Sequence, residues 1–202
     1  MITVHHLNKS RSKRVLWLLE ELGMPYEVVV HDRDATTNLA PDSLRAVHPL
    51  GKSPIIVDGD TTLCESGVIM EYILDQAGQS ALRPDTDSPD YYRYLEWLHF
   101  AEGSLALPVI ARMIMNMEQR AGDQPLDGYI TKEITVDFAY IEDILSRQAC
   151  FAGESFTAAD IMMTIMLEVA ASIGLLEGKT KTLAYLARMQ GRAAYQKAAR
   201  FG

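Results

Sequence analysis

Cysteine is scarce in this 202-residue chain, which contains only Cys64 and Cys150. Two cysteines are too few for a disulfide framework, and no C-x-x-C pair indicates a zinc ribbon or a dithiol redox site. Each cysteine is more typical of a small buried apolar residue than of a nucleophile. We therefore expect a cytoplasmic protein that folds without disulfide bonds.

Long apolar runs and an excess of positive charge are also missing. The first apolar run, residues 15–19, is too short for the core of a signal peptide. The most apolar stretch, residues 161–175, contains Glu168 and falls short of a membrane span. Lys and Arg number 19 against 27 Asp and Glu, and the net charge of -8 repels nucleic acid and anionic lipid. We therefore expect neither nucleic acid nor a membrane as a partner.

Common nucleotide and metal motifs do not occur in the sequence. There is no G-x-G-x-x-G, nucleophile elbow or H-E-x-x-H. The Gly-Lys-Ser run at 51–53 is similar to the end of a phosphate loop, but Ala46 replaces the first glycine and Pro54 blocks the required helix. His5 and His6 point to opposite faces of a strand, so they favour structural roles over shared metal ligation. We expect no bound metal.

The first 81 residues alternate between strand and helix patterns. The expected elements are a strand at 2–7, a helix at 12–22, a strand at 26–30, a short helix from Pro41, strands at 55–57 and 61–64, and a helix from Ser66. The two short strands form a hairpin through the Asp-Gly-Asp turn at 58–60. This order, βαβαββα, predicts an α/β domain at residues 1–81.

Beyond a polar segment at 82–89 that is typical of a linker, the chain keeps helical spacing. Helices are expected over 90–121, with a kink at Pro108, over 129–149, and after a capping box at 157–160. The helix after the capping box is apolar on every side and must be buried, with shorter helices at 182–189 and 192–200 covering it. Residues 90–202 are therefore expected to form an all-α bundle domain.

Four local signals occur together, and their combination is more specific than any one of them. They are Ser10 just before the first helix, a Ser53-Pro54 pair opening the third strand, a Glu65-Ser66 pair opening the third helix, and the run RVLWLLEELGMPYE at 14–27. In this combination the whole chain resembles the glutathione S-transferase family, in its bacterial and fungal serine-type branches. The resemblance implies a thioredoxin-like first domain and a cytoplasmic homodimer that acts in detoxification.

The resemblance also implies an activity and the residues that carry it out. Glutathione is the co-substrate, and its thiolate adds to a hydrophobic electrophile held between the first domain and the helix at 90–121. Ser10 donates a hydrogen bond to the thiolate, since a hydroxyl is too weak a base to take the thiol proton. Arg11 adds positive charge, and Asn8 is the alternative donor. The absence of cysteine at 10–13 disfavours dithiol exchange and leaves conjugation or peroxidase chemistry.

The rest of glutathione matches further residues that the resemblance assigns. Pro54 is expected in the cis form, which turns the backbone of Ser53 toward the cysteinyl residue. Glu65 accepts from the ligand ammonium, and Ser66 at a helix N-terminus holds the γ-glutamyl carboxylate. Lys52 reaches that carboxylate or the glycyl end. Without the other motifs, the Glu65-Ser66 pair is read as a simple helix cap.

The basic side chains are unevenly distributed, and two other classes of function stay open. Lys9, Arg11, Lys13 and Arg14 are expected to surround the anionic ligand with positive potential. The same fold also serves as a non-catalytic interaction module. A glutathione-dependent isomerase or dehalogenase is the other alternative. The sequence does not identify the electrophile.

Overall fold

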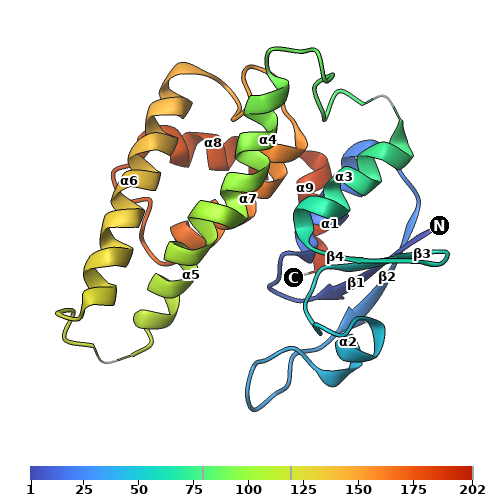
Figure 1. Ribbon diagram of the computed structural model, residues 1–202, viewed down its shortest axis with the longest axis horizontal. Coiled ribbons are helices and arrows are strands. Elements are labelled where there is room, and N and C mark those ends of the chain that lie inside the picture. The colour runs from blue at the N-terminus through green and yellow to red at the C-terminus, as the bar shows by residue number, and fades with distance from the viewer. Residues whose placement is uncertain (79, 119, 202) are drawn as a thin grey trace. The chain divides into compact units, whose positions relative to one another are not determined.

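The chain forms two compact units in the computed structural model, which describes residues 1–78, 80–118 and 120–201 (Figure 1). Unit 1 comprises Met1–Ser80 together with Gln190–Gly202, and unit 2 comprises Ala81–Met189. Unit 1 is the thioredoxin-like α/β part, and unit 2 is helical. The fold class predicted from the sequence is confirmed.

Unit 1 has the predicted βαβαββα order. It also includes the C-terminal helical segment. Its elements are β1 (Ile2–Leu7), α1 (Ser12–Leu22), β2 (Tyr26–His31), α2 (Asp42–Val47), β3 (Ile55–Asp58), β4 (Thr61–Cys64), α3 (Ser66–Ala77), α9 (Ala193–Ala198) and the 3-10 helix η2 (Ala199–Phe201). The strand order is β2-β1-β3-β4. β1 pairs in parallel with β2, whereas β1 with β3 and β3 with β4 are antiparallel pairs.

The sheet of unit 1 lies between two helical layers. Figure 1 shows α1 and α3 on one side of the sheet and α2 on the other. On the α2 side, Leu7 and Ile55 of the sheet form a buried cluster with Leu44 of α2. On the other side, residues 15–19 of α1 are fully buried, including Trp17. Because alternate residues of β1 face opposite sides of the sheet, each residue packs against only one of the two helical layers.

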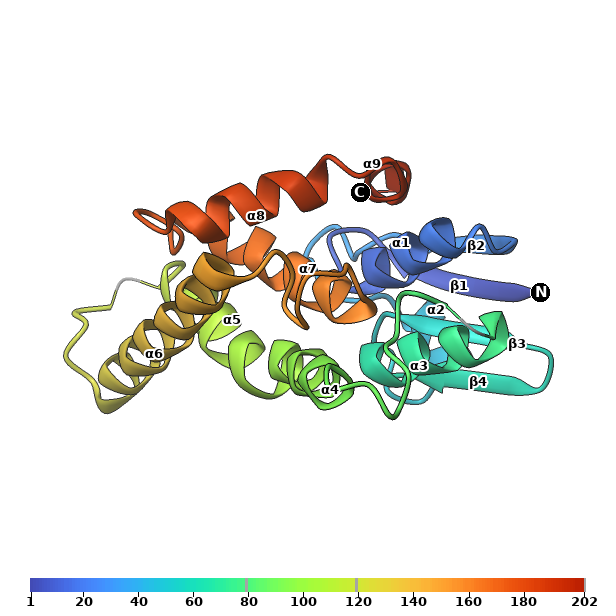
Figure 2. The same cartoon turned by 90° about the horizontal axis from the view of Figure 1, so that it is seen from above.

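The segment that contains α9 belongs to unit 1, where it packs on α1 (Figure 2). Arg192 forms a bidentate ion pair with Glu21, with contacts of 2.6 and 2.8 Å. The ring of Tyr195 meets Trp17 edge to face, with centroids 5.1 Å apart. The sequence analysis places residues 190–202 with the helical domain, but these contacts place them with unit 1. An ion pair between residues so distant in the sequence produces no periodic pattern, so periodicity could not predict this placement.

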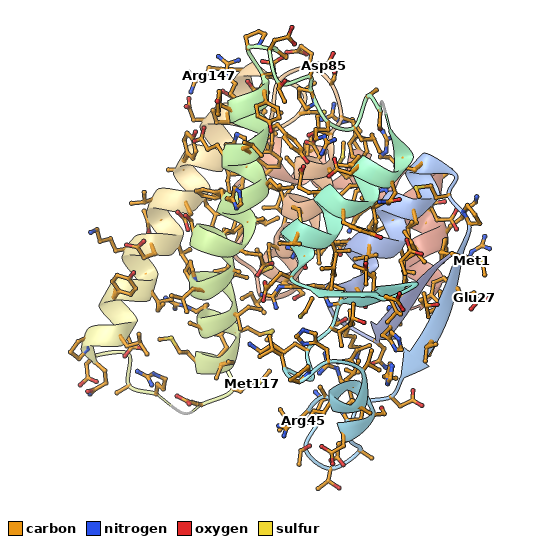
Figure 3. All side chains as sticks on the ribbon, turned by 45° about the vertical axis from the view of Figure 1, so that its right-hand side comes forward. Met1, Glu27, Arg45, Asp85, Met117 and Arg147 are labelled. Carbon is orange, nitrogen blue, oxygen red and sulfur yellow. The ribbon has the colours of Figure 1, made fainter. Side chains whose placement is uncertain are left out.

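Unit 2 is helical throughout its regular secondary structure, as predicted. Its elements are α4 (Tyr91–Phe100), the π-helix η1 (Ala101–Leu105), α5 (Ala106–Met115), α6 (Pro125–Arg147), α7 (Ala158–Ser172) and α8 (Thr180–Gln190), whose last residue falls in unit 1. Figure 3 shows Asp85, before α4, and Arg147, at the end of α6, at one end of this unit, with Met117 at the other. α7 is buried along most of its length, which confirms the prediction from its uniformly apolar sequence.

The predicted irregularity at Pro108 takes the form of a π-helical turn. The five residues Ala101–Leu105 are π-helical, and regular helix resumes at Ala106. Proline has no N–H for the carbonyl four residues earlier, and its ring clashes with that carbonyl in a regular helix. The wider turn just before Pro108 relieves both problems. The continuous helix ends at Met115, earlier than the predicted residue 121.

One helical stretch among the described residues is long and apolar enough to cross a membrane by length and composition. It runs from Tyr91 to Met115, and 39% of its most apolar window is buried. Its inner side chains, Tyr94, Trp97 and Leu105, are buried, and α4 packs on α7. A core helix meets the same criterion, so this composition does not by itself indicate a membrane.

The capping box before α7 is a buried hydrogen-bond centre. The carboxylate of Asp160, which is fully buried, accepts from the N–H groups of Thr157 at 2.8 Å and Phe151 at 3.0 Å. It also accepts from the hydroxyls of Thr157 at 3.1 Å and Tyr185 at 2.8 Å. Asp160 therefore ties the start of α7 to the preceding loop and to α8.

A second buried acid, Asp137 on α6, predicts a pH-dependent stability. Its Oδ2 atom is buried with no hydrogen-bond partner among the described residues. Burial, and to a lesser extent the charge of Glu133, raises the pKa of Asp137 to about 6. The folded state therefore binds this proton more tightly than the unfolded state, and the free energy of unfolding falls as pH rises from about 4 to about 6.

Replacing Asp137 with Asn is expected to increase the free energy of unfolding at pH 7.5 by on the order of 1–3 kcal/mol. The gain should be smaller at pH 4.5, where the native aspartate is largely protonated. Urea unfolding of both proteins at the two pH values measures the difference. An equal gain at both pH values would contradict this explanation.

Candidate functional site

Ser10 and Ser53, two residues assigned to the site from the sequence, lie next to each other in the structure. Ser10 is half-buried in the connection between β1 and α1. Its Oγ is 3.2 Å from Oγ of Ser53 and 3.3 Å from the N–H of Ser12, the first residue of α1. The antiparallel register of β1 and β3, which pairs His5 with Ile55, brings the residues before β3 to this place. The sheet thus joins positions 43 residues apart.

The loop that carries Ser53 has a defined backbone. The Ser53-Pro54 peptide bond is cis, as the resemblance implies. Ahead of it, Gly51 has a φ of +57°, and a Cβ there would lie 2.6 Å from Cγ of Arg45. A residue with a side chain is therefore disfavoured at this turn on both counts. The Ser53 hydroxyl donates to the His5 carbonyl at 3.2 Å, while Lys52 stays exposed.

Glu65 and Ser66 begin α3 in a way that differs from an ordinary helix cap. Glu65 has a φ of 80°, which is strained for a residue with a side chain. Its exposed side chain makes no capping hydrogen bond within the described part of the chain. The Ser66 hydroxyl is buried and accepts from Nη1 of Arg14 at 3.4 Å. The simple-cap interpretation is therefore wrong for Glu65, whose carboxylate is left facing solvent.

The four basic residues near the start of α1 do not form one cluster. Lys9 is exposed and Arg11 is half-buried. Lys13 instead lies over the ring of Tyr195 on α9, with Nζ 5.0 Å from the centroid and 3.4 Å from the hydroxyl. Arg14 is fully buried and reaches Ser66. Successive helix residues point about 100° apart, so a run of basic residues spreads around the helix. Arg14 contacts Ser66, one of the predicted glutathione residues.

Asn8, the alternative donor, lies in a tight turn after β1. Its Oδ1 atom is buried without a hydrogen-bond partner among the described residues. Arg33, which the sequence analysis did not single out, holds this turn by donating to the carbonyls of Asn8 and Lys9, both at 3.1 Å. Lys9 has a φ of 51°. The turn is therefore held through its backbone, and the choice between Ser10 and Asn8 stays a prediction.

Neither cysteine has the properties of an activated nucleophile. Cys150 is buried, and Cys64 is half-buried at the end of β4. Burial raises the pKa of Cys64, although a hydrogen bond with the backbone of Glu65 and, less strongly, the charge of Lys52 partly oppose this. A raised pKa lowers the thiolate fraction. In residues 1–78, 80–118 and 120–201 no group of three or more His, Cys, Asp or Glu side chains is arranged to hold a metal.

Beneath Ser10 lies a buried polar chain that the sequence analysis did not predict. The Ser12 hydroxyl is 2.8 Å from Oγ of Ser10 and 2.8 Å from Nδ1 of His6. Nε2 of His6 is 2.8 Å from the carbonyl of Phe201 in η2. His5, as expected, points to the other face, where Nδ1 is 3.0 Å from Nε2 of His31. The sequence predicts only that His5 and His6 lie on opposite faces of the strand, and it contains no sign of the contact between His6 and Phe201.

Comparison with known proteins identifies the family. Residues 4–81 match the family model described as Glutathione S-transferase, N-terminal domain. Glutathione S-transferase 3 of Schizosaccharomyces pombe is 37% identical over 81% of this chain and 72% of its own length. A glutathione S-transferase structure from Actinobacillus pleuropneumoniae superimposes with a TM-score of 0.90 and 29% identity, covering 99% of this chain and 92% of that one.

A more distant structure shares the fold. The glutathione transferase URE2P8 from Phanerochaete chrysosporium, solved with oxidized glutathione, has a TM-score of 0.80 at 20% identity and covers 98% of this chain and 93% of that one. The fold and the relatives define a two-part protein with a thioredoxin-like α/β part and a helical part. The chain belongs to the glutathione S-transferase family.

Proposed function

We propose that this protein is a glutathione transferase that stabilises the glutathione thiolate with the Ser10 hydroxyl and adds it to a hydrophobic electrophile. The observation that carries the proposal is the position of Ser10 at the N-terminus of α1, within 3.2 Å of the serine that precedes a cis-proline. The helix N-terminus contributes partial positive charge at this point, which favours an anionic sulfur.

The residues around Ser10 match the remaining parts of glutathione. We assign the backbone of Ser53 to the cysteinyl residue of the ligand, by strand-like pairing. The buried Ser66 hydroxyl at the N-terminus of α3, with Arg14 behind it, suits the γ-glutamyl carboxylate. The exposed Glu65 carboxylate suits the ligand ammonium, and the exposed Lys52 suits a second carboxylate. Each charged group of the tripeptide thus has a partner of opposite charge or a helix N-terminus.

Stabilising the thiolate greatly increases the ionised fraction of glutathione at neutral pH. A thiol with a pKa of about 8.5 is only about 3% ionised at pH 7. Lowering that pKa by about two units raises the ionised fraction to roughly three quarters. No metal is needed for this step. Catalysis then requires only that the electrophile be held near the sulfur.

Replacing Glu65 with Gln is expected to weaken glutathione binding by about 10-fold or more, because a charge-assisted hydrogen bond to the ligand ammonium is worth about 1.5–3 kcal/mol. Isothermal titration with glutathione measures the dissociation constant. Glu27→Gln, which removes another exposed acid, on β2, serves as the matched control and should bind like the wild type. An unchanged dissociation constant for Glu65→Gln would show that Glu65 does not contact the ligand.

The same titration of the wild-type protein separates the proposal from a non-catalytic module of this fold. Saturable binding at millimolar glutathione or below, together with conjugation of a chloronitrobenzene, supports a transferase. No binding at millimolar concentration favours the module. Binding without conjugation favours a glutathione-dependent isomerase, dehalogenase or peroxidase. A cytoplasmic homodimer is part of the same proposal and rests on the family alone.

A further inference from the structure

The donor and acceptor in each hydrogen bond of the polar chain beneath Ser10 can be assigned, beginning at η2. The Phe201 carbonyl can only accept, so at 2.8 Å the Nε2 atom of His6 must carry a proton and donate it. His6 is fully buried, and burial lowers its pKa, although the bond to Phe201 partly opposes this. At rest His6 is therefore neutral, and its Nδ1 atom is an acceptor.

The tautomer of His6 determines how the serine hydroxyls are oriented. Because Nδ1 accepts, the hydroxyl of Ser12 must donate to it across 2.8 Å. The Leu7 carbonyl, at 3.4 Å, is the poorer acceptor for this hydroxyl. With its single proton committed to His6, the Ser12 oxygen accepts from its other neighbours. One of these is the Ser10 hydroxyl, 2.8 Å away.

Ser53, on the other side of Ser10, is an acceptor and does not donate to it. The Ser53 hydroxyl donates to the His5 carbonyl, so it has no proton to offer Ser10. Among its protein neighbours, Ser10 can donate to Ser12 at 2.8 Å, the shorter contact, or to Ser53 at 3.2 Å. One lone pair of Ser10 Oγ accepts a hydrogen bond from the N–H of Ser12 at 3.3 Å. In this resting arrangement Ser10 presents a lone pair, not a proton, to an incoming ligand.

We propose that His6 and Ser12 form a proton relay that accepts the thiol proton of bound glutathione through Ser10. The inference rests on the proposed function. The thiol S–H donates to Ser10 Oγ, Ser10 passes its own proton to Ser12, and Ser12 passes its proton to Nδ1 of His6. Each hydroxyl gains one proton and loses one, so the products are a thiolate and an imidazolium.

The relay leaves Ser10 in the orientation that stabilises the thiolate. After transfer, the proton on Ser10 is the one received from sulfur, and it points back at the sulfur as a hydrogen-bond donor. The imidazolium of His6 keeps its Nε2–H bond to Phe201 and places a positive charge behind the two serines. A thiolate paired with an imidazolium is stabilised relative to a lone thiolate. Ser10 is then the residue that touches substrate, whereas Ser12 and His6 are positioning residues.

The protonation of His6 provides a direct test that does not depend on turnover. The ¹⁵N chemical shifts of the two ring nitrogens are far apart in the neutral tautomer and nearly equal in the imidazolium. The chain has five histidines, so His6→Gln identifies the signals of His6. At pH 7.5, saturating glutathione is expected to convert His6 to the imidazolium in proportion to the ultraviolet absorbance of the thiolate. S-methylglutathione, which has no thiol proton, should leave His6 neutral.

Two relay variants and one control complete the experiment. Ser12→Ala should leave His6 neutral in the presence of glutathione. Both Ser12→Ala and His6→Gln should raise the pH midpoint of thiolate formation by about one unit, a tenfold change in the ionisation equilibrium. His31→Gln removes another buried histidine, on the other face of the sheet, and should leave that midpoint unchanged.

The outcomes distinguish the relay from the proposed function. If glutathione binds and forms a thiolate while His6 stays neutral, the proton goes to solvent and the relay is wrong, but the transferase proposal stands. An unchanged midpoint in folded His6→Gln or Ser12→Ala protein would overturn the relay in the same way. If the wild-type protein does not bind glutathione, both proposals fail together.

Discussion

Replacing Ser10 with alanine is expected to lower kcat for conjugation of a chloronitrobenzene by at least about tenfold. The change removes a hydrogen-bond donor aimed at a developing anion, and removal of one such donor from a preorganised site typically costs 10²–10³ in rate. The same change interrupts the relay, because the Ser10 oxygen is the atom within 2.8 Å of Ser12. Steady-state kinetics at saturating glutathione measure the effect.

The controls for this prediction distinguish Ser10 from its alternative. Ser172→Ala removes an exposed hydroxyl that donates to the Val169 carbonyl on α7, and it should leave kcat unchanged. Asn8→Ala should have a smaller effect than Ser10→Ala. Unchanged turnover in Ser10→Ala, with loss in Asn8→Ala, would move the donor role to Asn8. The affinity for glutathione should change less than kcat, since the hydrogen bond strengthens as negative charge develops.

Replacing Asp160 with alanine is expected to lower the free energy of unfolding by on the order of 3–5 kcal/mol or to prevent folding. The carboxylate is fully buried and accepts four hydrogen bonds, two from backbone N–H groups and two from hydroxyls. Its removal leaves the donors of Phe151, Thr157 and Tyr185 buried without a partner. Each unsatisfied donor costs about 1–3 kcal/mol. Urea unfolding followed by circular dichroism measures the loss.

Two further variants show whether the hydrogen bonds account for that loss. Asp160→Asn keeps the size of the side chain and one accepting oxygen, so it should lose less stability than Asp160→Ala. Asp143→Ala removes an acid that is paired with Arg147 on the exposed surface of α6, and it should cost less than about 1 kcal/mol. A comparable loss in Asp160→Ala and Asp143→Ala would show that the buried network adds little.

Local rules were sufficient for the elements of the fold. The strand-forming residues at 2–7 and the helical spacing over 12–22 match β1 and α1 in the structure. Gly23, with a φ of 63°, ends α1 because a left-handed residue accommodates the C-cap, and glycine adopts that conformation freely. Pro108 accompanies the π-helical turn between α4 and α5 because it lacks an N–H. Each of these effects depends on a few neighbouring residues, so it can be predicted from the sequence.

The site was only partly predictable. Ser10, Ser53 and Ser66 were identified from the sequence through the resemblance, and the register of β1 with β3 brings the first two into contact. Arg14 is predicted, with Lys9, Arg11 and Lys13, to surround the ligand with positive potential, yet it is buried against Ser66. Helical spacing already places Arg14 on the same side as Leu18, but the charge of a side chain favours an exposed assignment unless its partner is known.

The sequence by itself determined the order of helices and strands, the helical character of the second part and the family to which the chain is similar, because these follow from periodicity and short motifs. Only the tertiary structure placed η2 beside β1, where the Phe201 carbonyl meets His6. A backbone carbonyl is the same in every residue, so no side-chain pattern indicates which one will accept a particular proton. The orientation of the His6 and Ser12 protons under Ser10 depends on that long-range contact, which exists only once the chain has folded.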